Sequence, residues 1–366
     1  MSRLAVLPII ACLLGLGATQ AGSADTTRAK IDATFIFTND IHACRTQSGL
    51  SPNCEQEGKT DANLLRHVNA LNHLGGKIWP AEIGGAATGL ASAGTPIGKP
   101  LGLVIGGDMT DDGGGQVTDP AEGTQLLQFS HRYQEGSGPG RINFPVYVGL
   151  GNHDLDQDGP PPHADWYRRE MRDYVEVNHR PSVIFKPPLP ASDYDMESDN
   201  FSWDWGGLHL VQLQRFGGDT RKGAVSGLPW LKRDLATFAA DGRPVILFQH
   251  YGWDSFSTES WDPDRKTFDD AGHGAPHWWS ADERQALLDA IVGYNVIGIF
   301  HGHQHETPMI YSEGELDLFK PVAAFMGGFA VVRVTDERLD VALGVAEGDD
   351  GEVRFTNAFS KLLPAR

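Results

Sequence analysis

The chain has 366 residues, of which 40% are hydrophobic and 21% are charged, a composition that excludes an intrinsically disordered protein and predicts a globular one. Its 48 acidic and 30 basic residues give a formal net charge of −18, which argues against a nucleic-acid-binding surface because phosphate backbones select clusters of Lys and Arg. A bound metal ion could still provide one electropositive site in such a chain.

Residues 1–24 have the pattern of a secretory signal peptide. Arg3 supplies a basic start, an apolar stretch of 14 residues runs from Leu4 to Gly17, and small residues follow. Because this stretch is shorter than the ~20 residues that span a bilayer, we expect no transmembrane anchor. The sequence therefore predicts a secreted or periplasmic protein whose residues 25–366 form one domain.

The cysteines are Cys12, Cys44 and Cys54. Cys12 lies in the leader, where lipid attachment is a less favoured alternative to cleavage. The other two make an even pair in an oxidising compartment, which predicts a disulfide between Cys44 and Cys54; two free thiols are the alternative. Neither cysteine has the CxxC spacing of a redox or zinc site, so both interpretations make the pair structural.

Five short apolar segments are each followed by residue types that bind metals. The segments are residues 33–38, 101–105, 145–150, 244–248 and 296–300. Runs of this length with β-branched residues predict buried strands. Helical patterns lie between them, at residues 61–74, 165–176 and 281–292. This alternation predicts an α/β sheet with its ligands at the carboxyl ends of the strands.

A second set of apolar segments shows partial alternation of apolar and polar residues, which suits a second, more antiparallel sheet. These segments are residues 208–213, 322–325, 330–334 and 339–345. We expect two packed sheets with helices outside them. Three loop-like insertions interrupt this pattern, at residues 75–100, 155–200 and 252–280, and insertions of this length are usually functional or mobile.

The residues after the five predicted strands form a set of ligands that combines carboxylate, amide and imidazole groups. Its members are Asp40, His42, Asp108, Asn152, His250, His303 and His305. Mixed nitrogen and oxygen ligands without thiolates suit Mn, Fe, Zn or Co. The set has more ligands than one ion binds and enough for two. In hydrolytic sites two such ions lie about 3.5–4 Å apart.

These residues lie in five motifs: D-x-H at Asp40, G-D at Asp108, G-N-H-[DE] at Asn152, a single His at His250, and G-H-x-H at His303. In this order the motifs resemble the signatures of the calcineurin-like metallophosphoesterase superfamily, from residue 33 to about residue 305. The resemblance implies an α/β fold, a four-layer αββα sandwich of two mixed β-sheets flanked by helices. It also implies a phosphoric ester hydrolase.

The resemblance further implies how two divalent or trivalent transition-metal ions are held. Asp40, His42 and His305 would bind one ion, Asn152, His250 and His303 would bind the other, and Asp108 would bridge them. Such a centre makes hydroxide available at neutral pH for attack on phosphorus. The expected substrate is a small phosphodiester or phosphomonoester, and no nucleic-acid partner is expected.

Five further residues are candidates for catalysis and substrate binding. We expect His153 to protonate the leaving oxygen, with Asp154 orienting its ring; a mere binding contact is the alternative for His153. Arg45 could contact a phosphate oxygen. Trp253 and Phe256 open a Trp-rich stretch that could wall a pocket for an organic group such as a lipid headgroup. A loop held by its own aromatic core is the alternative.

The sequence differs from the motifs of two subgroups of the family, and these differences narrow the choice of subgroup. The Arg-Gly that protein phosphatases carry between the second and third motifs is missing, and Asp111 stands where purple acid phosphatases need a tyrosine. Asp111 is expected in a solvated turn, with support of a metal ligand as the alternative. The first and third motifs resemble periplasmic nucleotidases, so a nucleotidase-like phosphomonoesterase is an alternative. A secreted lipid- or surface-binding protein on the same fold is the alternative from another class.

Overall fold

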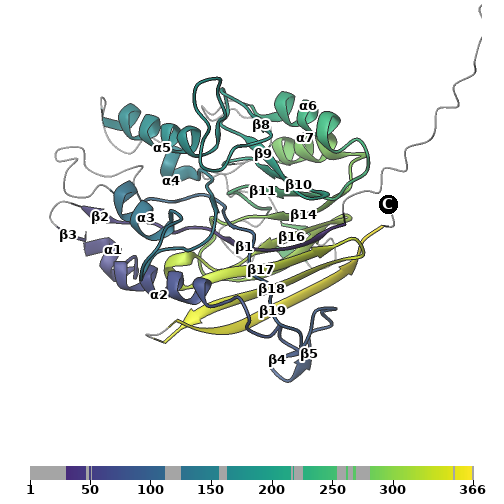
Figure 1. Cartoon of the computed structure of the whole chain (residues 1–366), viewed down its shortest axis with the longest axis horizontal. Coiled ribbons are helices and arrows are strands. Elements are labelled where there is room, and N and C mark those ends of the chain that lie inside the picture. Colours follow the sequence, from purple (N-terminus) through teal and green to yellow (C-terminus); the bar gives the residue numbers. More distant parts are fainter. Residues whose placement is uncertain are drawn as a thin grey trace, which may run out of the picture.

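Figure 1 shows the computed structural model, in which two large β-sheets lie together with helices around them. The structure describes residues 30–46, 49–50, 52–111, 125–155, 163–215, 217, 226–253, 261–262, 267–268, 281–348 and 351–364. Both large sheets mix parallel and antiparallel strands. The predicted fold class, two mixed sheets flanked by helices, is confirmed.

The first sheet has six strands and contains the first predicted strand near its middle. Their order is β19 (Glu352–Leu362), β18 (Arg338–Glu347), β17 (Gly328–Thr335), β1 (Asp32–Thr38), β6 (Leu103–Ile105) and β7 (Val146–Tyr147). β1, β6 and β7 are parallel, whereas β17, β18 and β19 form an antiparallel meander. The loops that follow the three parallel strands therefore meet at one edge.

The second sheet has seven strands. Their order is β15 (Met309–Glu313), β16 (Leu316–Lys320), β14 (Val296–Phe300), β11 (Val245–Phe248), β10 (Leu208–Gln212), β9 (Phe201–Trp205) and β8 (Asp193–Tyr194). The four middle strands from β16 to β10 are parallel. Three two-stranded hairpins complete the strands: β2 (Arg45–Thr46) with β3 (Gly49–Leu50), β4 (Glu82–Ile83) with β5 (Ala86–Ala87), and β12 (Trp261–Asp262) with β13 (Thr267–Phe268).

The helices are α1 (Pro52–Gln56), α2 (Asp61–Asn72), α3 (Gln125–Tyr133), α4 (Asn152–Leu155), α5 (His163–His179), α6 (Leu228–Phe238) and α7 (Ala281–Ile291). α2 begins at an N-cap, where the Thr60 side chain accepts a hydrogen bond from the Asn63 amide. α6 and α7 bury leucines against the second sheet, among them Leu231, Leu235 and Leu287. None of the described helices is long and apolar enough to cross a membrane.

An aromatic layer joins the two sheets beneath the strand ends. Phe35 and Phe37 project from the same face of β1, because side chains two residues apart in a strand share a face. Phe37 lies 5.8 Å from Phe248 and 5.4 Å from Phe300, measured between ring centroids. Since Phe248 and Phe300 end β11 and β14, this packing brings the carboxyl ends of strands from both sheets to one place.

The expected strand at residues 322–325 is wrong. This segment contains a 3₁₀ helix, η2 (Ala324–Met326), which ends at Gly327 with a φ of 95°, a conformation that glycine adopts without strain. The expected grouping of strands is also wrong, since residues 330–334 and 339–345 join the sheet of β1, and residues 208–213 lie beside β11. The insertion predicted at residues 155–200 is partly helical, because it contains α5.

Candidate metal centre

The structure brings all seven candidate ligands together at the carboxyl ends of strands from both sheets. Asp40 and His42 follow β1, Asp108 follows β6, Asn152 follows β7 at the start of α4, His250 follows β11, and His303 and His305 follow β14. Two groups of three residues have ligand atoms within 4.8 Å of one another: Asp40, His42 and His305, and Asp108, His250 and His303. The first group is the set that the resemblance implies for one ion, and the second joins His250 and His303 to Asp108, the implied bridging residue.

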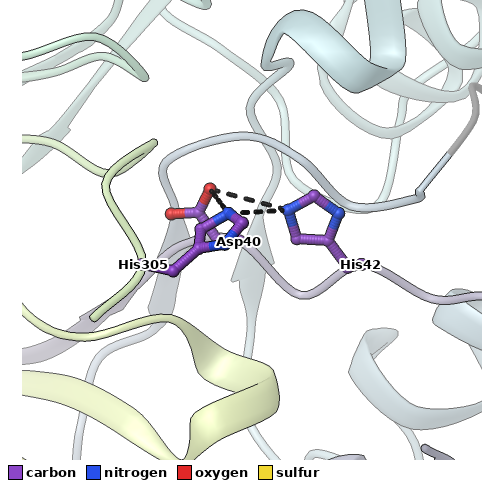
Figure 2. Close-up of side chains that lie close together, drawn as sticks. All are labelled: Asp40, His42 and His305. Atoms are coloured by element: carbon purple, nitrogen blue, oxygen red, sulfur yellow. Dashed lines mark hydrogen bonds and ion pairs between the residues drawn. The ribbon is translucent and has the colours of Figure 1, made fainter. Parts of the chain in front are cut away.

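In the first group, two imidazole rings and one carboxylate point toward one another (Figure 2). The Nε2 atoms of His42 and His305 lie 3.1 Å apart. Asp40 Oδ1 lies 3.4 Å from His305 Nε2 and 3.8 Å from His42 Nε2. This arrangement directs three donor atoms at one point.

In the second group, His250 Nε2 lies 3.0 Å from Asp108 Oδ2 and 3.0 Å from Asn152 Oδ1. The same Asp108 oxygen is 3.6 Å from His42 Nε2, which belongs to the first group. Asp108 therefore approaches the first group as well as its own, as a bridging ligand would.

The donor set fits a pair of cations. Asp40 Oδ1 and Asp108 Oδ2 are buried, and within the described part of the chain neither accepts a hydrogen bond of good geometry, which is unfavourable for a carboxylate oxygen. Burial opposes ionisation of both carboxyl groups, but the neighbouring histidines, His250 foremost, together outweigh burial and hold the pKa of each well below its usual value. Two buried anionic oxygens beside imidazole nitrogens suit borderline divalent metals.

The backbone is strained where the ligands are attached. Only six non-glycine residues in the described ranges have a positive φ, and four of them are candidate ligands: Asp40 at 52°, His42 at 47°, Asp108 at 51° and His303 at 73°. Such conformations cost about 1–3 kcal/mol each and persist where the surrounding structure enforces them. The strain is therefore concentrated at the centre.

Two motif glycines are required by close approach. A Cβ atom at Gly151 would collide with the Asp108 carboxylate, and one at Gly302 would lie 2.5 Å from Asp40 Oδ2. Glycine therefore precedes Asn152 and His303 because the loops that carry the ligands pass directly over the carboxylates of other motifs.

Outer hydrogen bonds fix the orientation of two ligand rings. His42 Nδ1 lies 2.9 Å from Asp111 Oδ1, and His250 Nδ1 lies 3.1 Å from the carbonyl oxygen of Gly106. A ring that donates from Nδ1 keeps the lone pair of Nε2 for a metal ion. Asp111 is thus a supporting residue rather than part of a solvated turn.

His153 lies beside the centre. Its amide donates to Asp108 Oδ1 at 2.9 Å, and its Nδ1 donates to the carbonyl oxygen of Asp111. Its ring lies edge-on to that of His42, with centroids 4.6 Å apart. Burial lowers the pKa of His153, but Asp108 and Asp111 outweigh it and raise the pKa above the usual value.

The prediction that Asp154 orients the His153 ring is corrected, because the Asp111 carbonyl makes that contact. The Asp154 carboxylate is buried and accepts hydrogen bonds from the amides of Met109, Thr110 and Gly151. Burial and the neighbouring charge of Asp108 raise the pKa of Asp154 to about 6. Its contacts give it a structural role, tying the loop after β6 to the start of α4.

The predicted substrate contacts have different outcomes. Trp253 is buried with 3% exposure, packs in the core beside the second sheet, and donates from its backbone amide to Tyr311 Oη at 3.0 Å. Its assignment as a pocket wall is therefore wrong. Phe256 and the Arg45 side chain lie outside the described residues, as do the leader and most of residues 252–280.

Cys44 and Cys54 are joined by a disulfide, with their Cα atoms 6.2 Å apart. The bridge connects the loop after β1, two residues beyond His42, to α1. It therefore attaches a peripheral helix directly to a ligand loop.

A model of the calcineurin-like phosphoesterase family matches residues 33–307. A search of curated proteins gave no match. Among solved structures, a dimetal phosphatase from Danio rerio has a TM-score of 0.50 at 11% identity, covering 91% of this chain and 100% of that one. A 5′-nucleotidase from Candida albicans has a TM-score of 0.39 at 12% identity, covering 84% of this chain and 48% of that one. The calcineurin-like phosphoesterase YfkN from Bacillus subtilis has a TM-score of 0.35 at 12% identity, covering 91% of each chain.

Proposed function

The chain belongs to the calcineurin-like phosphoesterase family and is a phosphoric ester hydrolase; from this premise we propose that it is an exported two-metal enzyme acting on a small phosphodiester or phosphomonoester. The observation that carries the proposal is the pair of ligand groups that meet at Asp108, whose Oδ2 approaches a histidine of each group. A shared carboxylate between two nitrogen-rich groups is the arrangement used for in-line displacement at phosphorus.

Asp40, His42 and His305 would hold one ion, Asn152, His250 and His303 the other, and Asp108 both. When bound, two transition-metal ions supply a water of lowered pKa and neutralise charge on the phosphoryl oxygens. Asp111 fixes the ring of His42, and the Gly106 carbonyl fixes the ring of His250. In each ring, Nε2 is therefore the nitrogen left to bind a metal ion.

His153 would act as the general acid. Because its Nδ1 is occupied by the Asp111 carbonyl, Nε2 is the nitrogen that can hold a proton for the leaving oxygen. Its raised pKa favours the protonated ring that a general acid requires. A small substrate is favoured because the net charge of −18 repels an extended polyanion.

Export is supported by two independent features. The sequence of residues 1–24 has the order of a signal peptide, and the Cys44–Cys54 disulfide suits an oxidising compartment. Expression of the full chain in a secreting host, followed by N-terminal sequencing of the exported protein, tests this point. Recovery of only uncleaved intracellular chain would contradict export.

Metal analysis combined with a substrate panel tests the activity. We expect about two transition-metal ions per chain and cleavage of bis-p-nitrophenyl phosphate or p-nitrophenyl phosphate, lost on chelation and restored by Mn²⁺, Zn²⁺ or Co²⁺. Adding nucleoside monophosphates to the panel separates the nucleotidase-like alternative from a diesterase. A protein that is loaded with metal but inert toward the whole panel would refute the proposal.

A further inference from the structure

Lys59 is a buried lysine outside the five motifs. It lies between α1 and α2, and its side chain is only 8% exposed. Its ammonium nitrogen lies 2.6 Å from Asp111 Oδ1 and 2.6 Å from Glu57 Oε2. A buried ammonium group needs specific partners, and of these two carboxylates the Asp111 side chain is the less exposed, at 23% against 54% for Glu57.

Asp111 connects Lys59 to two residues of the centre. The carboxylate oxygen that faces Lys59 also accepts a hydrogen bond from His42 Nδ1 at 2.9 Å. The main-chain oxygen of the same residue accepts from His153 Nδ1. One residue therefore holds the Nδ1 atom of a candidate metal ligand and the Nδ1 atom of the candidate acid.

We propose that Lys59 is a positioning residue of the metal centre, which fixes the ring tautomers of His42 and His153 by holding Asp111 in place. The inference rests on the proposed function for its catalytic consequence. A neutral imidazole carries its proton on one nitrogen only, so a fixed acceptor at Nδ1 leaves the Nε2 lone pair of His42 for a metal ion. If the Asp111 carboxylate turns away, that constraint is lost.

The charge of Lys59 also keeps Asp111 an acceptor. An ammonium group can only donate, so the Asp111 Oδ1 atom that lies 2.6 Å from Lys59 Nζ accepts there. An ionised carboxylate can only accept hydrogen bonds. It therefore forces Nδ1 of His42 to be the donor.

The surrounding structure holds Lys59 rigidly. Its backbone amide donates to the Cys54 carbonyl at 2.8 Å, and Cys54 is joined to Cys44 by the disulfide. Its ammonium group lies 5.7 Å from the centroid of the Phe325 ring, and that ring stands edge-on to His42. The disulfide thus ties the segment that presents Lys59 to the loop that carries His42.

Substitution of Lys59 in the full mature chain tests the proposal. Lys59→Met removes the charge and keeps the length, whereas Lys59→Arg keeps the charge. Lys361→Met is the matched control, because Lys361 forms a similar partly buried pair with Asp317, at 2.5 Å, on β19. Long-range ¹H–¹⁵N spectra of the metal-free proteins report the tautomers of His42 and His153, and titration with Zn²⁺ reports metal affinity.

We expect Lys59→Met to convert His42 from a single tautomer to a mixture, and to reduce Zn²⁺ affinity and kcat by about 10-fold each with little change in KM. Lys59→Arg should keep the single tautomer of His42 and most of the wild-type Zn²⁺ affinity and kcat. Adding Lys59→Met to Asp111→Asn should change kcat by less than about 2-fold, because both act through one contact.

Unchanged histidine spectra and Zn²⁺ affinity in Lys59→Met, with a loss of thermal stability like that of Lys361→Met, would overturn the proposal. The spectra and the Zn²⁺ titration do not depend on catalysis. If the wild-type protein cleaves no phosphoester, the proposed function fails while the role of Lys59 is still decided by these two measurements.

Discussion

Among the described residues, two clusters of histidine and aspartate differ in how their atoms are used. One is the metal centre. The other, which we call the His209 cluster, consists of Ser202, Asp204, His209 and Asp234, and links β9 and β10 to α6. By residue type alone, either could be read as a catalytic or metal-binding group.

In the His209 cluster, both ring nitrogens of His209 and the Ser202 hydroxyl meet carboxylate oxygens. His209 Nδ1 lies 2.7 Å from Asp204 Oδ1, Nε2 lies 2.9 Å from Asp234 Oδ2, and Ser202 Oγ donates to the other Asp234 oxygen at 2.6 Å. Burial lowers the pKa of His209, but its hydrogen bonds to the Asp204 and Asp234 carboxylates and their charges outweigh burial and raise the pKa to about 9. The cluster is a closed ion pair that stabilises the fold.

In the metal centre, by contrast, two Nε2 atoms face each other at 3.1 Å, and Asp40 Oδ1 and Asp108 Oδ2 accept no well-formed hydrogen bond among the described residues. The backbone of Asp40 and Asp108 is strained, whereas no member of the His209 cluster has a positive φ. Open donor atoms on a strained backbone therefore distinguish a ligand set from a structural ion pair.

The largest effect is expected for Asp108→Asn. It removes the charge that both ligand groups share, so phosphoesterase activity should fall by more than about 100-fold. A loss of about 100-fold is the upper range when a hydrogen-bond partner of a metal ligand is removed. Metal content should fall with it. The metal-free variant should unfold at a lower temperature than the metal-free wild type, because the buried ion pair between Asp108 and His250 is lost. Calorimetry and elemental analysis measure both; a variant that keeps two ions and full activity contradicts the assignment.

His153→Ala should separate acid catalysis from binding. If His153 protonates the leaving oxygen, substrates with poor leaving groups such as alkyl phosphoesters should lose about 100-fold or more in kcat/KM. Activated p-nitrophenyl esters should lose far less, because their leaving group needs no proton. Equal losses for both classes would make His153 a binding residue, as its contact with the edge of the His42 ring allows.

Asp234→Asn should have the opposite profile to Asp108→Asn. It leaves His209 with one charged partner inside the fold, so the free energy of unfolding should fall by about 3 kcal/mol. Metal content and kcat should not change, since in the described part of the chain the hydrogen bonds of Asp234 run to Ser202 and His209 and not to the centre. Urea unfolding and elemental analysis test this. Loss of metal from a folded Asp234→Asn protein would break the distinction between the two clusters.

The sequence predicts the ligands better than their supports. Asp40, Asp108 and Asn152 could be placed together because each follows an apolar segment, and parallel strands end at the same edge of a sheet. The contact between Lys59 and Asp111 joins residues 52 positions apart through a loop, and no periodicity encodes it. Trp253 was misassigned because nearness to His250 in the chain does not reveal that its side chain turns into the core.

The fold likewise has features that the sequence predicts and features that it does not. Single strands such as β1 and β14 were predicted to within a residue or two, because a run of apolar β-branched side chains is a local signal. The assignment of β17 and β18 to the sheet of β1 depends on contacts between segments about 300 residues apart. Local patterns carry no information about such pairings.

The smallest effect is a pH dependence of stability confined to the His209 cluster. The pKa of His209 is about 9 in the folded protein and about 6.5 when unfolded, so the protonated ring contributes stability that is fully present below pH 6.5 and lost as the pH rises through 9. The free energy of unfolding of wild type minus that of His209→Gln should therefore be a few kcal/mol at pH 6 and near zero above pH 10. Subtraction removes the titration of other groups, including His250, whose pKa is raised to about 9 by Asp108 and Asp40 against the effect of burial. A difference that stays constant from pH 6 to pH 10 would show that His209 is not charged in the fold, and the cluster would then be a neutral hydrogen-bond network rather than an ion pair.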